Sequence, residues 1–248
     1  MSACTGFRLT CLTIWLVAPV AMAQHAGDIF VGRSAADQLK NAGFPVSLNL
    51  IYLPPSDGIL HGWADNTPGF DRVITDDPDR DLFRMRSGAN IFLVIDAIDP
   101  AFRVIDGSFN VFDDPGEAAR LGNENLHTHL IWHIDDRDAD FDPEQCLWDA
   151  TFILHDDNGR HSDSAPFTMS FTNVPLREAD GDFEPDGDVD LDDYRALSVC
   201  LSGPAARPAP NDPEVTTCET ACVNAFDFDA DRDVDLRDAA EMQNRFGS

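Results

Sequence analysis

The chain has 248 residues, and its 17 lysine and arginine residues face 45 aspartate and glutamate residues, which leaves a formal net charge of −28 at pH 7. A protein with this charge repels phosphate backbones and anionic lipid surfaces, so the composition argues against nucleic acid as a partner. Apolar residues make up 43% of the chain, which is enough to build a core and sets it apart from disordered acidic tails.

The first 23 residues have the three-part pattern of a secretory signal peptide. Arg8 is their only charged residue, an apolar run extends from Leu12 to Val20, and a small-x-small cleavage site ends at Ala23. The apolar run is too short to span a bilayer comfortably, and no later stretch is long and apolar enough to do so. We therefore expect cleavage after Ala23, a secreted, extracellular or periplasmic location, and no membrane span.

Residues 24–175 predict an antiparallel β-sandwich with a jelly-roll-like arrangement, so the expected fold class is mainly β. Short apolar runs of period two alternate with Asp, Pro and Gly breaks, and no long helix is indicated. The expected strands are residues 46–52, 91–95, 102–105, 108–112, 126–134, 147–154 and 167–171. Trp63 and Trp148 are candidates for stacking against a sugar, although packing in the core is the interpretation that we favour.

The expected strand 126–134 carries the histidines of chemical interest. On a strand, His127 and His129 share one face with His133, whereas Leu126, Thr128, Leu130, Trp132 and Ile134 share the other face, which we expect to be the core. Same-face neighbours lie roughly 6.6 Å apart, so His127 and His129 can chelate one Zn²⁺ or Cu²⁺ ion. His133 is too far away, and further ligands would have to come from His61, His155 or His161. A hydrogen-bonded histidine face without metal is the alternative that we favour.

This segment weakly resembles the first motif of the cupins, metal-binding β-barrel proteins with an HxH pair that follows a glycine. Here Gly122 precedes His127 and His129, but His133 stands where the motif has an acid, and no second cupin motif is present. The resemblance implies a transition-metal site at His127 and His129.

The character of the sequence changes after residues 176–181, which we interpret as a linker. Residues 182–248 are rich in acidic side chains and contain two stretches of helical apolar spacing. The apolar positions of the two stretches are Leu191, Tyr194, Leu197 and Leu201, and then Leu236, Ala239, Ala240 and Phe246. A Pro-rich connector lies between them. Four cysteines remain after cleavage, namely Cys146, Cys200, Cys218 and Cys222, and we expect a disulfide from Cys200 to Cys218 or Cys222.

Two twelve-residue segments, 182–193 and 227–238, carry carboxylates at positions 1, 3, 5, 7, 9 and 12. These are Asp182, Glu184, Asp186, Asp188, Asp190 and Asp193 in the first, and Asp227, Asp229, Asp231, Asp233, Asp235 and Asp238 in the second. Calcium takes six to eight oxygen ligands, and a tight loop with acids at alternate positions wraps those ligands around one point. Position 7 supplies its backbone carbonyl in this template, and position 12 closes the site from the first turn of a helix. Each segment therefore predicts a Ca²⁺ site.

The duplicated loop and helix resemble the dockerin type I family of secreted bacterial proteins. The resemblance implies a small helical module that holds two Ca²⁺ ions with the acids named above and docks onto a cohesin-like partner. A cell-surface component is the alternative partner that we consider. Three features depart from the family: Glu184 at position 3, Arg232 where a turn glycine is usual, and the long connector. Because position 6 needs a positive φ, Arg232 costs about 1 kcal/mol, and we expect the second site to be the weaker one.

No nucleophile with a neighbouring base is recognisable, and we predict no catalytic residues. The leading hypothesis is a secreted, non-catalytic, calcium-binding protein with a dockerin-like tail and a β-domain of unknown ligand. An extracellular accessory protein that binds or degrades polysaccharide is the second hypothesis. A cupin-like transition-metal protein is the third.

Overall fold

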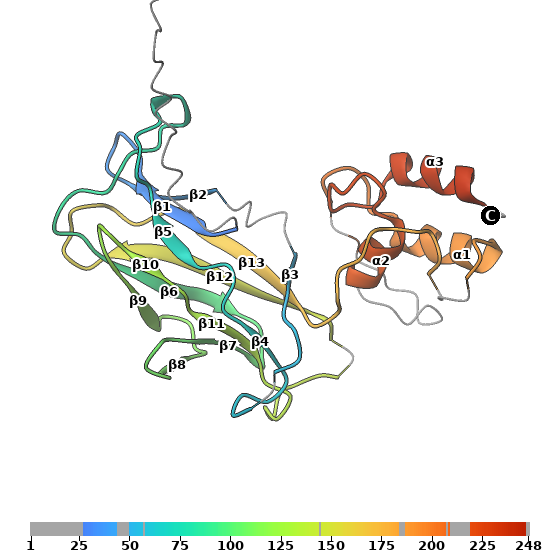
Figure 1. Ribbon diagram of the computed structural model, residues 1–248, viewed down its shortest axis with the longest axis horizontal. Coiled ribbons are helices and arrows are strands. Elements are labelled where there is room, and N and C mark those ends of the chain that lie inside the picture. The colour runs from blue at the N-terminus through green and yellow to red at the C-terminus, as the bar shows by residue number, and fades with distance from the viewer. Residues whose placement is uncertain are drawn as a thin grey trace, which may run out of the picture.

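The computed structural model describes residues 27–43, 50–56, 58–143, 145–183, 187–206, 208 and 219–246. The predicted signal peptide, residues 1–23, lies outside them. Within the described residues, strands in three sheets come first and three α-helices come last (Figure 1). The protein is therefore mainly β with a helical C-terminal part, as the sequence predicts.

The three sheets contain all the named strands. The first has the order β10 (His127–Thr128), β5 (Phe70–Arg72), β1 (Ile29–Arg33) and β2 (Leu39–Gly43). The second has the order β4 (Trp63–Asp65), β11 (Ile131–Ile134), β7 (Phe102–Ile105) and β8 (Val111–Phe112). The third has the order β3 (Leu50–Tyr52), β13 (Phe167–Thr172), β12 (Leu147–Asp156), β6 (Asn90–Ile98) and β9 (Ala118–Asn123). Pairing is antiparallel except between β1 and β5 and between β3 and β13, and a short 3₁₀ helix, η1 (Pro78–Arg80), lies between β5 and β6.

The core of the β-domain follows from the period-two pattern. Along residues 148–156 of β12 every second side chain is buried and those between are half-buried, as expected for a strand with one face on the core. Side chains of the second and third sheets meet there. The rings of Phe102 and Phe171 stack with 4.4 Å between centroids, and Trp132 packs against Phe171 as well. Burial of one such aromatic side chain contributes about 2 kcal/mol.

The two tryptophans considered for sugar stacking pack inward. Trp148 is fully buried. Trp63 is half-buried, and its ring stacks on Phe141 with 6.0 Å between centroids, while the other neighbour of Phe141 is Trp148. The core interpretation is therefore confirmed for Trp148, which offers no face to a sugar.

The single strand expected over residues 126–134 is wrong. The chain instead forms β10 in the first sheet and β11 in the second, with His129 between them. The ring of His129 lies so close over Gly69 that a Cβ there would approach it to 2.5 Å, and its Nδ1 is 2.8 Å from the Asn66 carbonyl oxygen. These contacts hold the chain where it passes from one sheet to the next. The prediction that Leu126, Leu130, Trp132 and Ile134 face the core is confirmed, because all four side chains are buried.

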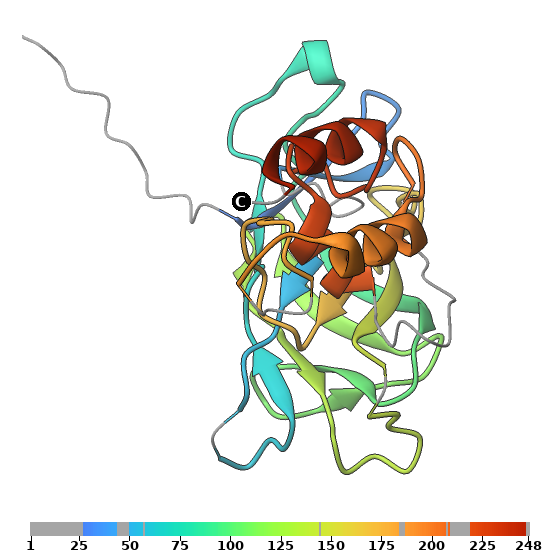
Figure 2. The ribbon, with the colours of Figure 1, turned by 90° about the vertical axis from the view of Figure 1, so that its right-hand side faces the viewer.

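In the described residues of the C-terminal part the chain forms three helices: α1 (Leu191–Cys200), α2 (Glu219–Phe226) and α3 (Leu236–Arg245). Helix α2 packs against both α1 and α3. The helical C-terminal part faces the viewer in Figure 2. A disulfide between Cys200 and Cys222 joins α1 to α2, which confirms one of the two expected pairings. Cys146 is also disulfide-bonded, and Cys218 lies outside the described residues. None of the helices in the described ranges has the length and apolar character needed to cross a membrane.

The apolar faces expected for α1 and α3 are wrong in part. Leu191 and Leu236, the first residues of the two helices, are 71% and 80% exposed, and Tyr194, Leu201 and Phe246 are exposed too. The buried face of α1 instead carries Asp193, Ala196, Leu197 and Cys200, and that of α3 carries Asp238 and Met242. These positions also have helical spacing. An aspartate belongs to each buried face because its carboxylate accepts hydrogen bonds from the preceding loop.

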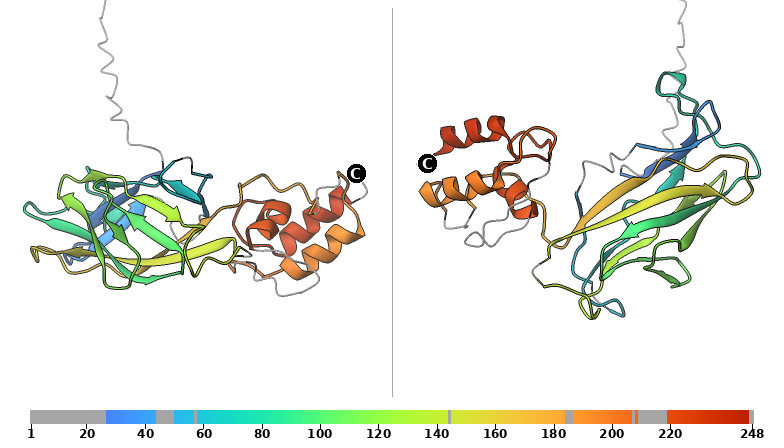
Figure 3. Two further views of the ribbon diagram at one scale, coloured as in Figure 1. Left: turned by 90° about the horizontal axis from the view of Figure 1, so that it is seen from below. Right: turned by 180° about the vertical axis from the view of Figure 1, so that it is seen from behind.

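The segment after β13 is attached to α2. The Thr220 hydroxyl donates to the Thr172 hydroxyl over 3.0 Å in a buried position. The Asn224 side chain donates to the Pro175 carbonyl oxygen and accepts from the Arg177 backbone N–H. Figures 1 and 3 show the helices beyond the end of the β-domain where β12 begins and β13 ends.

Candidate metal centre

The two acidic segments fold into loops with the same internal frame, which we call loop 1 (residues 182–193) and loop 2 (residues 227–238). Position 9 is the N-cap of the following helix in both, with φ and ψ of −130° and −156° at Asp190 and −123° and −162° at Asp235. Each helix begins at position 10 and has ten residues. The expected helix after each loop is thus confirmed, and the duplication extends to the backbone.

The aspartate at position 12 ties both ends of its loop together. In loop 1, one carboxylate oxygen of Asp193 accepts from Phe183 N at 2.6 Å and the other accepts from Asp190 N at 2.8 Å. In loop 2, Asp238 accepts in the same way from Phe228 N and Asp235 N, both at 2.8 Å. Both aspartates are 1% exposed. The side chains of Asp190 and Asp235 accept in return from the backbone N–H of position 12, which completes a capping box in each loop.

The aspartate side chain at position 1 holds the turn at position 6 by accepting a hydrogen bond from the backbone there. Asp182 accepts from Gly187 N at 3.0 Å, and Asp227 accepts from Arg232 N at 3.1 Å. The φ angles at position 6 are +96° for Gly187 and +72° for Arg232, so the positive φ expected there is confirmed in both loops. Arg232 adopts it despite its side chain, at a cost of about 1 kcal/mol.

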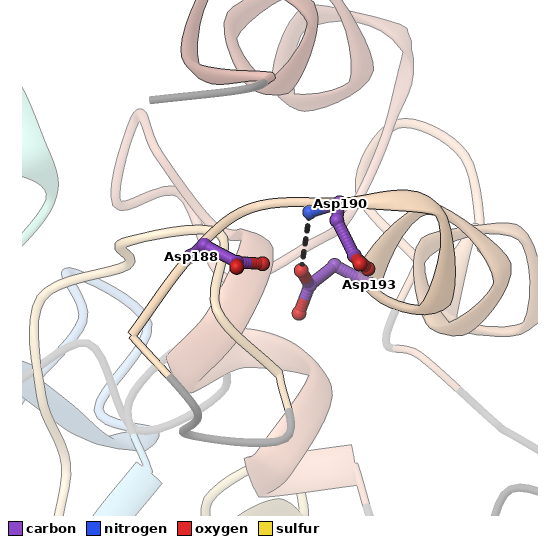
Figure 4. A group of neighbouring side chains, drawn as sticks. All are labelled: Asp188, Asp190 and Asp193. Carbon is purple, nitrogen blue, oxygen red and sulfur yellow. Dashed lines mark hydrogen bonds between the residues drawn. The ribbon is translucent and has the colours of Figure 1, made fainter.

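The loops bring their carboxylates together in groups of three. Within each group one oxygen per residue lies within 4.8 Å of the others, and the groups are Asp188, Asp190 and Asp193; Asp227, Asp229 and Asp231; and Asp233, Asp235 and Asp238. Figure 4 shows the first group, with the carboxylates of Asp188 and Asp193 turned toward one another. Positions 7, 9 and 12 therefore converge in both loops, and positions 1, 3 and 5 converge in loop 2. Glu184 and Asp186, positions 3 and 5 of loop 1, lie outside the described residues.

Burial makes the charged state of these carboxylates costly. The pKa values of Asp227, Asp233 and Asp238 are raised above the ordinary aspartate value of 3.8, first because burial removes water from the carboxylates and then because neighbouring acids of loop 2 repel the charge. The charges of Asp229 and Asp227 both raise the pKa of Asp238. The two groups of three in loop 2 therefore interact electrostatically.

One oxygen of this set lacks a partner. Asp233 is 4% exposed; its Oδ2 accepts from the backbone N–H of Ala205, whereas its Oδ1 is buried and has no hydrogen-bond partner among the described residues. A buried anionic oxygen without a donor is strongly unfavourable unless a cation compensates it. Asp235 and Asp238 place further carboxylate oxygens within reach, so this position suits a cation with oxygen ligands.

Arg237, at position 11 of loop 2, supplies a positive charge at the rim of the loop. Its guanidinium lies 3.6 Å from a carboxylate oxygen of Asp229 and 3.9 Å from one of Asp231, and its side chain is 75% exposed. Position 11 of loop 1 is Asp192 instead. A basic residue within an acidic loop is the signal in the sequence for this contact.

The histidines do not assemble a comparable centre. The rings of His127 and His129 meet edge to face at 5.5 Å between centroids, and His127 Nδ1 lies 3.7 Å from Asp71. Neither histidine belongs to any of the metal-capable groups of three or more in the described part of the chain. His133 is buried with its Nε2 on the His61 carbonyl oxygen, and burial lowers its pKa. His155 pairs with Asp163, and His161 accepts from the Arg86 backbone N–H.

The chain matches no protein-family model, and no curated protein shows significant similarity to it.

Proposed function

We propose that residues 182–246 form a dockerin-like module that binds two Ca²⁺ ions, one in each loop. The observation that carries this proposal is the shared frame of hydrogen bonds, which directs carboxylates of both loops to common points. The buried oxygen of Asp233 without a donor is a second, independent sign that a cation belongs there.

The donor set favours calcium over transition metals. Each of the three clusters of aspartates offers oxygen ligands alone, and none includes a histidine or a cysteine. Cys200 and Cys222 are held in their disulfide and supply no thiolate. Carboxylate and carbonyl oxygens in a flexible loop suit Ca²⁺, whereas Zn²⁺ and Cu²⁺ prefer nitrogen and sulfur.

Calcium has a structural role in this proposal. Among the described residues of the module, the core consists of nine buried residues, which include Phe226, Val234 and Met242. So small a core needs additional stabilisation, which a disulfide and bound metal supply. Extracellular calcium is plentiful enough to fill even weak sites, so the proposal fits the secreted location that residues 1–23 predict.

Thermal unfolding of the full chain tests the proposal. In 1 mM CaCl₂ the transition of the helical module should lie higher than in a chelator by about 10 °C or more. The transition of the β-domain, which has its own core, serves as the internal control and should stay in place. Identical curves in calcium and chelator would contradict calcium binding.

Two exposed leucines favour the docking role that the dockerin resemblance implies. Leu191 and Leu236 occupy position 10 of the two loops and lie on the surface at the start of α1 and α3. A cohesin-like protein module is accordingly the partner that we propose. Titration of a type I cohesin in calcium, with Leu191→Ser and Leu236→Ser as variants, tests this. Absence of heat with the unmodified chain would rule that partner out.

The finer assignment of the β-domain is also a proposal. We propose a jelly-roll-like sandwich, because aromatic side chains of the second and third sheets share one core. A crystal structure with the sheets unstacked would contradict it.

A further inference from the structure

A cavity of about 580 Å³ on the β-domain gathers four arginines in a strongly acidic protein. Its lining includes the four arginines Arg33, Arg72, Arg84 and Arg86. Among the described residues, Asp76 and Glu124 are the acids that line it, so the lining by itself carries a charge of 4 − 2 = +2. The whole chain has a net charge of −28 and only 17 basic side chains. Asp37 pairs with Arg33 and Arg86, and Asp71 pairs with Arg72, from outside the lining. Both carboxylates lie within the distance of about 8 Å over which salt leaves charges unscreened, so including them gives 4 − 4 = 0. The cavity is therefore distinguished by four clustered guanidinium groups and not by a net positive charge.

The strand arrangement explains how these arginines meet. Arg33 and Arg72 are the last residues of β1 and β5, which run parallel and therefore end at the same edge of the first sheet. Arg84 and Arg86 lie on the long loop between β5 and β6. The turn between β9 and β10 adds Glu124 and Asn125 to the lining.

The arginines are held in place but keep donor capacity. The hydrogen bonds of each guanidinium engage at most two of its three nitrogen atoms within the described residues. These bonds run from Arg33 to the Arg84 and Ser34 carbonyl oxygens, from Arg72 to Asp71 and the Asn125 carbonyl oxygen, from Arg84 to Asp76, and from Arg86 to Asp37. Asp37 and Asp71 do not line the cavity. Five N–H donors on each planar group leave several for a ligand.

The supporting residues give the cavity a fixed frame. Arg86 is anchored through its backbone N–H, which donates to buried His161. Glu124 accepts from the Ser87 hydroxyl and from Gly88 N, which joins the β9–β10 turn to the arginine loop. The guanidinium of Arg33 also lies over the ring of Phe83, at 5.3 Å from its centroid. Such anchoring lowers the entropy lost on binding.

We infer that this cavity binds a sugar acid, meaning a saccharide unit that carries a carboxylate or sulfate group beside free hydroxyls. Guanidinium groups recognise planar and tetrahedral oxyanions through paired hydrogen bonds. The carboxylates of Asp76 and Glu124 accept hydrogen bonds from hydroxyls but repel a bare phosphate or sulfate ion, which is why the chemistry favours an acidic polyol. Ile74 and Met85 add apolar surface for a sugar face. The volume lies within the range of small-molecule sites.

Isothermal titration of the full chain in 1 mM CaCl₂ tests the inference with two matched disaccharides. Cellobiouronic acid and cellobiose differ by one carboxylate, and sodium sulfate is the third probe. We expect binding of cellobiouronic acid that weakens as NaCl is raised, with cellobiose and sulfate each bound at least about tenfold more weakly. The inference does not depend on calcium binding, which the melting experiment measures separately.

Two neighbouring arginines provide matched variants. Arg84 lines the cavity, whereas Arg80 does not; both are exposed and paired with an aspartate of the same loop. Arg84→Gln should weaken binding of cellobiouronic acid about tenfold, Arg84→Lys should weaken it less, and Arg80→Gln should leave it within about twofold. Circular dichroism confirms that each variant is folded.

Three results would overturn the inference. The first is no heat with cellobiouronic acid at 10 mM, chosen as about the weakest affinity worth calling a site. The second is equal affinity for the disaccharide acid and for sulfate, which would mean a plain anion site. The third is equal weakening by Arg80→Gln and Arg84→Gln, which would mean that total charge, not the cavity, governs binding.

Discussion

Loop 1 and loop 2 have the same backbone frame but different charges around it. Aspartates at positions 1, 9 and 12 accept the same backbone N–H groups in both loops. Position 6 is Gly187 in loop 1 and Arg232 in loop 2, and position 11 is Asp192 in loop 1 and Arg237 in loop 2. The frame thus depends on a few aspartates, while neighbouring positions change the charge that surrounds it.

The largest effect is expected from Asp238→Asn. The variant loses one negative charge and keeps only one of the two oxygens that accept from Phe228 N and Asp235 N. At calcium about a thousandfold above the dissociation constant, it should remove about 4 kcal/mol of calcium-dependent stability from loop 2. Denaturant unfolding with and without calcium measures this difference. Asp192→Asn, at exposed position 11 of loop 1, is the control and should retain most of the stabilisation.

The second prediction concerns pH. Folding raises the pKa values of Asp227, Asp233 and Asp238, so in calcium-free protein the stability these groups provide is present below the unfolded pKa near 3.8 and is lost as pH rises through their folded values. Calcium must displace those protons at low pH, so its affinity for loop 2 should fall about tenfold or more between pH 7 and pH 4.5. Calorimetry in two buffers of different ionisation enthalpy should show proton release near pH 4.5. An affinity independent of pH would contradict the assignment of these residues.

The third prediction separates the loops by the charge at position 11. Arg237→Ala removes a cation that lies beside Asp229 and Asp231, so the affinity of loop 2 for calcium should rise about fivefold, a modest effect because the guanidinium is exposed. The opposite change, Asp192→Arg, should weaken loop 1 by a similar factor. Fluorescence or calorimetric titration of both variants checks this. Equal affinities in all three proteins would mean that position 11 has no influence.

The smallest effect is expected from Arg232→Gly. Glycine adopts φ = +72° without a Cβ penalty, so the substitution should stabilise the module by about 1 kcal/mol. Urea unfolding measures it, and the control is Gly187→Ala in loop 1, which should destabilise. Destabilisation by Arg232→Gly would mean that the arginine side chain contributes contacts worth more than the strain.

Local patterns could be predicted from the sequence, and long-range arrangements could not. The two loops and their helices follow from spacing within twelve residues, because each aspartate bonds to backbone within its own loop. Residues 126–134 also have the alternation of a strand, but the crossing between two sheets depends on Gly69, far away in the sequence. Helix α2 lies in the segment interpreted as a connector.

The arginine cavity illustrates the same limit. Arg33, Arg72 and Arg84 come from separate elements, and only the parallel pairing of β1 and β5 brings the first two to one edge. The sequence shows these residues as scattered charges. The position of Asp233 is similar, because the burial of its carboxylate depends on Ala205 of the connector.

Native mass spectrometry of the full chain, after dialysis against calcium and removal of loosely bound ions, tests the central claim most directly. The account predicts two Ca²⁺ ions for each chain, one in Asp193→Asn, one in Asp238→Asn and none in the double variant. A chain that carries no calcium, or a number of ions that these substitutions leave unchanged, would contradict it.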